Sequence, residues 1–268
     1  MKKGTLKMKK IGFFGAGKMA EGILSAIPSK KGVLMAEKVA ERAAELKAKY
    51  GVKTTDDVKE VAKKAQLLFL AVRPQDVASV ADEVRDILTS DQTIVSIVAG
   101  KTLARLREAF GRKVRLIRVM PNLALRANAG MCAITSAPRT PKEDVEAVEA
   151  ILGGAGATVV LKERDFDAVT ALSGSGPAYF AYMEEAMVEG GIALGLKPAV
   201  ARLLAEQTMY GTAKFLRESG MPLRPFIEGV CTKGGTTAAG MKFLDVPSFK
   251  KTVAATLKAA ADRSRELA

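Results

Sequence analysis

The sequence of 268 residues contains no histidine and only two cysteines. Without histidine, Ser-His-Asp hydrolysis, histidine-bound metal sites and histidine-assisted alcohol dehydrogenation are excluded. Any reaction must therefore handle its protons with hydroxyl groups, lysines, carboxylates or water. Cys132 and Cys231 are too few for a disulfide framework or an ordinary zinc site, so we expect two small, buried apolar residues and no metal.

Long apolar runs are also missing, since none approaches the roughly 18 residues that span a bilayer. The basic start followed by apolar residues 11–14 resembles a signal peptide, but glycines at 12, 15 and 17 and then Lys18 interrupt it. We therefore expect a cytoplasmic protein without membrane contact. Because Met8 would make a natural start, residues 1–7 are predicted to be a dispensable extension.

Aromatic residues make up only 5% of the chain, while the formal net charge is +13. The lysines and arginines are scattered among acidic residues, with no basic helix and no strip that combines aromatic and basic side chains. We therefore expect no nucleic-acid partner. The positive surface is expected to attract phosphorylated or carboxylated small molecules.

The first part of the chain alternates short apolar runs with longer amphipathic ones, as βαβ units do. Residues 67–72 and 93–98 are almost continuously apolar, which is typical of central parallel strands covered on both faces. The other predicted strands are 10–14, 33–36, 51–55, 114–119, 131–135 and 158–161. Helical patterns between the strands include 39–50, 56–64, 76–88 and 102–110.

From about Asp165 the sequence becomes alanine-rich with helical periodicity. We predict an α/β protein with a doubly wound Rossmann-type sheet in residues 1–164 that binds a dinucleotide. An all-helical domain in residues 165–268 is expected to serve the substrate and oligomerisation. Its long apolar faces predict burial against a second subunit, in a homodimer or larger homo-oligomer. The expected helices are 166–172, 177–195, 198–219, 222–231 and 248–267.

A glycine-rich turn follows the first predicted strand and opens a helix that runs to about Ile27. Its first glycine permits a tight turn, and its second lets a pyrophosphate approach the backbone at the helix N-terminus. The residues expected to bind the dinucleotide here are Phe14, Gly15, Ala16, Gly17, Lys18 and Met19, and Ala20 takes the third small position.

An acidic residue, Glu37, closes the second predicted strand about 20 residues after the turn, as in dinucleotide-binding folds. Its carboxylate suits the ribose hydroxyls of NAD and repels the 2′-phosphate of NADP. Lys38 and Arg42 favour the opposite choice. The sequence therefore leaves the preference between the two coenzymes open.

Three more segments come directly after predicted strands. Because the carboxyl ends of strands line the ligand crevice of an open α/β sheet, we expect the three segments to form one cofactor groove. The residues assigned to it are Ala71, Val72, Arg73, Pro74, Ser96, Ile97, Val98 and Asn122.

The segment 167–179, which includes Leu172-Ser173-Gly174-Ser175-Gly176-Pro177, resembles the segment that links the two domains of pyrroline-5-carboxylate reductases. Gly234-Gly235-Thr236-Thr237 is similar to the C-terminal signature of that family. The glycine turn, residues 71–74 and Met120-Pro121-Asn122 match it in the same order, so the resemblance spans nearly the whole chain.

The resemblance implies NAD(P)H-dependent reduction of the cyclic imine 1-pyrroline-5-carboxylate to proline, the last step of proline biosynthesis, and it favours NADPH. It also implies that the loop 234–237 binds the substrate carboxylate, with the hydroxyl of Thr237 near the ring nitrogen as the catalytic group. The successive N–H groups of this loop agree with an anion-binding nest. The residues expected to bind substrate are Ser175, Thr232, Gly234, Gly235, Thr236 and Thr237.

The sequence departs from the family pattern at three places. Thr232-Lys233 replaces Ser-Pro, Leu123-Ala124 replaces Thr-Pro, and Val58 stands where an asparagine is expected near the adenosine. These changes leave open a reductase of a six-membered cyclic imino acid or an inactive NAD(P)-binding regulator. Tyr210 and Lys214 have the spacing of short-chain dehydrogenases, but they lie in an alanine-rich helical segment.

Overall fold

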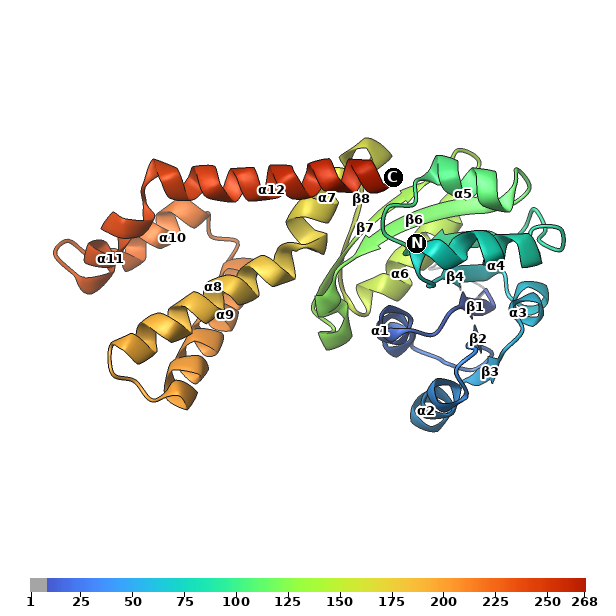
Figure 1. Ribbon diagram of the computed structural model, residues 1–268, viewed down its shortest axis with the longest axis horizontal. Helices are drawn as coiled ribbons and strands as arrows, with labels where there is room; N and C mark the ends of the chain where they lie inside the picture. The colour runs from blue at the N-terminus through green and yellow to red at the C-terminus, as the bar shows by residue number, and fades with distance from the viewer. Residues whose placement is uncertain (1–8) are drawn as a thin grey trace, which may run out of the picture. The chain divides into compact units, whose positions relative to one another are not determined.

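The structure, a computed structural model, describes residues 9–268 (Figure 1). It divides into two compact units, of which one runs to Ser175 and takes in Ala260–Ala268, and the other is Gly176–Ala259. The expected division after residue 164 stays a prediction, as does the function of each part. The interpretation of residues 1–7 and of Met8 lies outside the described residues.

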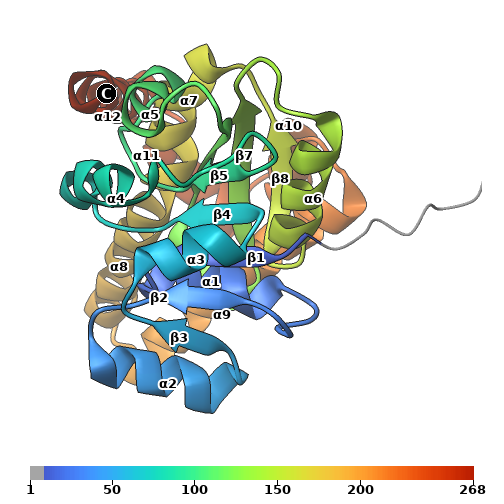
Figure 2. The ribbon, with the colours of Figure 1, turned by 90° about the vertical axis from the view of Figure 1, so that its right-hand side faces the viewer.

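The first unit contains a sheet of eight strands in the order β3-β2-β1-β4-β5-β6-β7-β8. Strands β3 to β6 run parallel, β7 is antiparallel to β6, and β8 is parallel to β7. Figure 2 shows β3 as the lowest strand of the sheet, with α2 below it. The predicted Rossmann-type sheet is confirmed, since the order from β3 to β6 is that of dinucleotide-binding folds. The strands are β1 Ile11–Phe14, β2 Leu34–Ala36, β3 Lys53–Thr55, β4 Leu67–Leu70, β5 Thr93–Ser96, β6 Arg115–Pro121, β7 Gly130–Ser136 and β8 Gly156–Val160.

Five parallel strands end at the same level of the sheet. Phe14, the last residue of β1, pairs with Ala36 of β2 and Leu70 of β4. Leu70 in turn pairs with Ser96 of β5, and Ala36 with Thr55 of β3. The loops that follow these strands are therefore brought to one edge, as the sequence predicted.

Helices cover both faces of the sheet because its strands are apolar on both sides. Phe13 and Phe14 are adjacent and fully buried, but they belong to different core clusters. Phe13 stacks on Phe69 of β4 with ring centroids 4.9 Å apart. Helices α1 Lys18–Ala26, α2 Ala40–Tyr50 and α6 Lys142–Gly153 contribute to the cluster of Phe13, and α3 Val58–Lys64, α4 Val77–Val84 and α5 Leu103–Phe110 to that of Phe14.

One buried carboxylate ties α6 to the sheet. The side chain of Asp144 is only 1% exposed. It accepts hydrogen bonds from the ammonium group of Lys9, the hydroxyl of Thr93 and the guanidinium of Arg115. A buried charge is tolerated only when it is paired in this way. Burial alone would raise the pKa of Asp144, but these partners hold it below its ordinary value.

The rest of the chain is helical, as predicted. A short helix α7 (Phe166–Val169) continues into a π-helical turn at Thr170–Gly174. The segment 236–244, for which no helix was expected, forms α11. The last turns of α12 return to the first unit, where the hydroxyl of Ser264 donates to Asp167 at 2.7 Å. The longer helices are α8 Gly176–Ala193, α9 Pro198–Ser219, α10 Leu223–Val230, α11 Thr236–Leu244 and α12 Pro247–Leu267.

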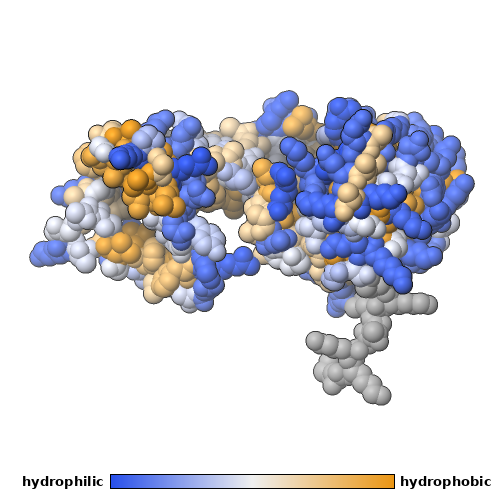
Figure 3. Space-filling view, turned by 90° about the horizontal axis from the view of Figure 1, so that it is seen from below, coloured by the Kyte–Doolittle hydropathy of each residue, from blue (hydrophilic) through white to orange (hydrophobic). Residues whose placement is uncertain are grey.

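The helical unit exposes many large apolar side chains, which appear as orange patches in Figure 3. Leu194 and Phe243 are 88% and 84% exposed, and Phe180 and Leu203 are both 66% exposed. A single chain does not bury the apolar surface of this unit. Among residues 9–268, no helix is long and apolar enough to cross a membrane.

The two cysteines differ in their surroundings. Cys132 is buried as expected, and burial raises the pKa of its thiol to about 12. Cys231, which follows α10, is only half-buried, so the expectation that both are buried was wrong for this residue.

Candidate dinucleotide and substrate sites

The glycine-rich turn starts where β1 ends, and its first glycine cannot be replaced without strain. Gly15 has a φ of +89°, and a Cβ there would lie 2.7 Å from the carbonyl oxygen of Ala71. The turn therefore packs directly against the loop after β4. Only glycine combines this left-handed backbone with so close an approach.

Gly17 is glycine for a different reason. It precedes α1 with a φ of −65°, which any residue adopts, and a Cβ added there would meet no protein atom within 4 Å. The open space lies at the N-terminus of a nine-residue helix, whose first N–H groups have no partner within the helix. The turn thus fits a pyrophosphate.

A pocket of about 520 Å³ opens beside this turn. It joins the loops that follow β1, β2, β3 and β4, as expected from the common level of the strand ends. The expected residues that line it are Gly15, Ala16, Gly17, Glu37, Lys38, Ala71, Val72 and Arg73.

Seven further residues line the pocket and were not expected from the sequence. Asp56 follows the last residue of β3 just as Glu37 follows β2, so the same strand-end rule would have found it. Val58 was noted only as a departure from the family pattern. The additional lining residues are Ala36, Val39, Asp56, Val58, Asp76, Ser79 and Val80.

The remaining expected residues do not line this pocket, and their contact with a dinucleotide stays a prediction. The side chains of Phe14 and Ser96 are buried, although the carbonyl of Phe14 accepts the N–H of Ala71 at 2.8 Å. The side-chain oxygen of Asn122 accepts the N–H of Met131 at 3.1 Å. The others outside the pocket lining are Lys18, Met19, Pro74, Ile97 and Val98.

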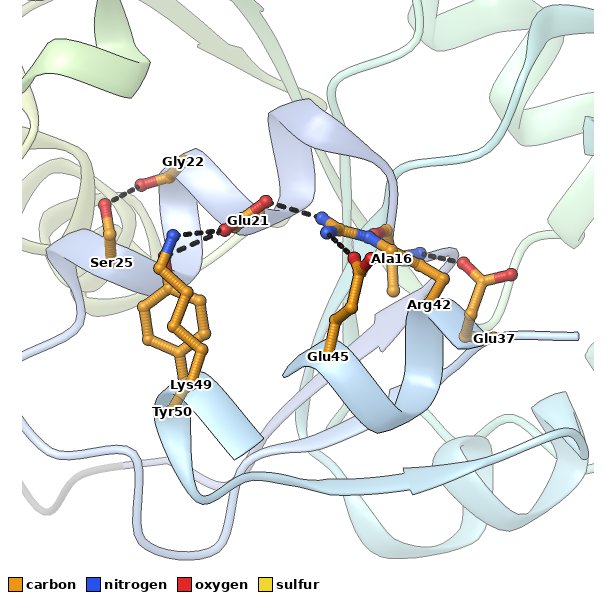
Figure 4. A network of polar contacts seen from close by, with 9 residues as sticks. All are labelled: Ala16, Glu21, Gly22, Ser25, Glu37, Arg42, Glu45, Lys49 and Tyr50. Carbon is orange, nitrogen blue, oxygen red and sulfur yellow. Dashed lines mark hydrogen bonds and ion pairs between the residues drawn. The ribbon is translucent and has the colours of Figure 1, made fainter. Parts of the chain in front are cut away.

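Two side chains from the segment after β2 bind the backbone of Ala16 in the glycine turn, one at its N–H group and the other at its carbonyl oxygen (Figure 4). The carboxylate of Glu37 accepts the N–H of Ala16 at 3.3 Å and the N–H of Val39 at 2.9 Å. Arg42 of α2 donates from Nε to the carbonyl oxygen of Ala16 at 3.0 Å. Both polar groups of the Ala16 backbone are therefore fixed by the second βα unit.

Arg42 is itself held by acidic residues. Its Nη2 contacts Glu21 of α1 at 2.6 Å, and its Nη1 contacts Glu45 at 3.0 Å. Glu21 also accepts from Lys49 at 2.8 Å and from the hydroxyl of Tyr50 at 3.0 Å. Hydrogen bonds from Lys49 and then Arg42 lower the pKa of Glu21 to about 2, so the carboxylate of Glu21 is ionised at neutral pH.

The glycine pair of the C-terminal motif forms a turn that leads into α11. Gly234 has a φ of +76°, and the N–H of Gly235 donates to the carbonyl of Thr232 at 2.9 Å. Thr236 and Thr237 are the first two residues of α11. The predicted loop 234–237 is thus half loop and half helix N-terminus, with two hydroxyls on its first turn.

The structure brings the C-terminal candidates together, because Thr232, Gly234, Gly235, Thr236 and Thr237 lie within one turn. Ser175 belongs to the first unit, where its N–H donates to the carbonyl of Thr170 at 2.8 Å. Its part in a substrate site stays a prediction.

The short-chain dehydrogenase interpretation of Tyr210 and Lys214 gains no support from their surroundings in the structure. Lys214 of α9 forms an ion pair with Glu218 one turn away, and Tyr210 is 62% exposed. Residues 9–268 contain no group of three or more cysteine, aspartate or glutamate side chains that could hold a metal ion.

Two protein-family models match different parts of the chain. Residues 163–267 match the family model described as pyrroline-5-carboxylate reductase dimerisation. Residues 10–100 match the model described as NADP oxidoreductase, coenzyme F420-dependent.

Curated relatives match over nearly the full length. The chain is 34% identical to pyrroline-5-carboxylate reductase 2 of Bacillus subtilis, over 97% of this chain and 95% of that protein. It is 35% identical to the pyrroline-5-carboxylate reductase of Arabidopsis thaliana, over 96% of this chain and 95% of that protein.

Solved structures agree. The pyrroline-5-carboxylate reductase of Coxiella burnetii superposes with a TM-score of 0.93 at 30% identity, covering 97% of this chain and 98% of that one. The Plasmodium falciparum pyrroline carboxylate reductase, solved with NADP bound, gives a TM-score of 0.85 at 27% identity, with the same coverage.

The open space at Gly17 generates a test. We expect Gly17→Asp to abolish dinucleotide binding while the protein stays folded, because the added carboxylate would occupy the pyrophosphate space and repel it. Titration calorimetry measures the binding, and circular dichroism checks the fold. Gly17→Asn, of similar size but neutral, should weaken binding less than Gly17→Asp. Unchanged affinity in a folded Gly17→Asp variant would contradict the assignment of this turn.

Proposed function

The chain belongs to the pyrroline-5-carboxylate reductase family, and we propose that it reduces 1-pyrroline-5-carboxylate to proline with a hydride from NAD(P)H. This is the last step of proline biosynthesis. In this proposal residues 1–164 bind the dinucleotide, and residues 165–268 serve the substrate and subunit association. The proposed location is the cytoplasm.

The observation that carries the proposal is the opening at the glycine turn. Gly15 allows the loops after β1 and β4 to meet, and Gly17 leaves the N-terminus of α1 free for a pyrophosphate. NADP is one coenzyme of the chain, as in the Plasmodium falciparum structure and in the family that residues 10–100 match. NADH is a second coenzyme that the acidic Glu37 favours.

The reaction does not require histidine. A protonated cyclic imine is already a strong electrophile, and the product amine collects its proton from solvent. The bound nicotinamide supplies the hydride. The chain therefore has to position the imine carbon and to match the charge of the substrate. Backbone N–H groups and hydroxyls are sufficient for both tasks.

We assign the substrate carboxylate to the turn that begins α11. The first N–H groups of this nine-residue helix have no partner within it, and the hydroxyls of Thr236 and Thr237 lie on the same turn. Lys233 and Thr232 precede the glycine pair, and the ammonium group of Lys233 adds positive charge beside the carboxylate. Thr237 is assigned to the ring nitrogen, and Ser175 is proposed as a further residue that binds substrate.

The role of Thr237 can be tested with a substitution that keeps its volume. Thr237→Val removes the hydroxyl and leaves the ring nitrogen without a partner. One lost hydrogen bond to a charged group is worth about 1.5–3 kcal/mol, so kcat/KM should fall about ten- to a hundredfold. Steady-state oxidation of NADPH with pyrroline-5-carboxylate measures this ratio.

The affinity for the nucleotide serves as the control for this variant, and it should change by less than about twofold because the glycine turn is untouched. A Thr237→Val enzyme within twofold of the parent in kcat/KM would contradict the assignment of α11 to the substrate. Complete loss of activity would instead identify Thr237 as the proton donor.

The helical region matches a dimerisation family, and we propose that the protein is an obligate homodimer or a larger homo-oligomer built on this region. The exposed apolar side chains, such as Leu194 and Phe243, would be costly in water and are expected to be buried by a partner. Light scattering at micromolar concentration should give at least twice the 28.4 kDa of one chain. A stable monomer under these conditions would be the contrary result.

A further inference from the structure

We propose that this chain binds NADH more tightly than NADPH. Two features set this preference, namely the carboxylate of Glu37 and the contacts that already engage the guanidinium of Arg42. The inference rests on the proposed function and deepens it, because it concerns the coenzyme of the same reaction. NADPH is still accepted, but as the weaker ligand.

The carboxylate of Glu37 is fixed at the end of β2, where dinucleotide folds place the adenosine ribose. It lines the pocket, and two backbone N–H groups, of Ala16 and Val39, hold it from either side. An acid held there can accept hydrogen bonds from both ribose hydroxyls of NADH. The 2′-phosphate of NADPH would bring about two negative charges close to the same oxygens.

Arg42 is the residue that could have reversed this preference, since an arginine near this position accommodates a 2′-phosphate in NADP-binding folds. Each of its three nitrogens is already engaged, with the carbonyl of Ala16, Glu21 and Glu45. Figure 4 shows its guanidinium directed at these groups. Reorienting the guanidinium toward a 2′-phosphate would weaken its hydrogen bond to the carbonyl of Ala16 and its ion pair with Glu21.

The remaining charges of the pocket do not compensate for Glu37. Its acidic lining residues are Glu37, Asp56 and Asp76, and its basic ones are Lys38 and Arg73. Arg73 forms an ion pair with Asp76 at 2.9 Å. Lys38 is thus the one basic residue of this pocket lining that forms no ion pair, and it is exposed, so its attraction for a phosphate is screened by solvent.

Glu37 also contributes to the start of α2, because it accepts the N–H of Val39. A purely structural role as a helix cap would affect both coenzymes equally. Only a contact with the ribose distinguishes ligands that differ in a 2′-phosphate. The ratio of the two affinities therefore separates the proposed role from the structural one.

The test is the direct binding of NADH and NADPH to the whole protein by titration calorimetry, without substrate. AMP and adenosine 2′,5′-bisphosphate, which differ only in the 2′-phosphate, repeat the comparison without the nicotinamide. The parent protein should bind NADH and AMP more tightly than their 2′-phosphorylated counterparts. Glu37→Ser should shift both ratios toward the phosphorylated ligand by at least about tenfold.

Glu37→Gln serves as a second variant, because it removes the charge and keeps one of the two side-chain acceptors for the backbone N–H groups. It should shift the ratios in the same direction as Glu37→Ser. Arg42→Ala is the matched control for the part of the proposal that concerns the contacts of Arg42. It should weaken both coenzymes by a similar factor, because Arg42 positions the turn and does not touch the phosphate.

Three results would overturn the proposal. They are a parent protein that prefers NADPH, a ratio that neither Glu37 variant changes, and an Arg42→Ala variant that loses affinity for NADPH alone. These outcomes leave the reductase function intact. Failure of the parent protein to bind any of the four ligands would instead contradict the proposed function itself.

Discussion

The site depends on one constraint, the common level at which five parallel strands end. The pairing of Phe14 with Ala36 and Leu70, continued to Ser96 and Thr55, fixes this level. A shift of one residue in any pair would turn side chains to the wrong face, and the two apolar core clusters resist it. Because the register is fixed, four loops distant in sequence line a single pocket.

At this edge of the sheet, the second βα unit fixes the backbone conformation of the glycine turn that follows β1. The N–H and the carbonyl of Ala16 are bound by Glu37 and Arg42, so the turn is organised before a ligand arrives. Preorganisation of this kind lowers the entropic cost of binding. It also links coenzyme choice to stability, since the guanidinium that could bind a 2′-phosphate also holds the turn and Glu21.

Much of the fold and part of the site could be predicted from local patterns. The alternation of short apolar runs with amphipathic segments located all eight strands to within two residues, and the central parallel strands gave the strongest local signal. Gly15 and Gly17 were identified because strand, turn and helix follow directly in sequence.

Contacts between residues that are distant in sequence could not be predicted. The engagement of Arg42 is one of them, since it depends on Glu21, which lies 21 residues away on another helix. The burial of Asp144, whose partner Lys9 is 135 residues distant, is another. The start of α11 at Thr236 was missed because glycines and threonines are poor helix formers.

We propose that this chain, which has no histidine, reduces a five-membered cyclic imino acid by positioning and charge alone. The most direct measurement is the oxidation of NADH and NADPH by the parent protein with pyrroline-5-carboxylate, run beside the six-membered analogue. We expect turnover with both coenzymes and a higher kcat/KM for the five-membered ring. Nucleotide binding without turnover of either imine, or a clear preference for the six-membered ring, would contradict this proposal.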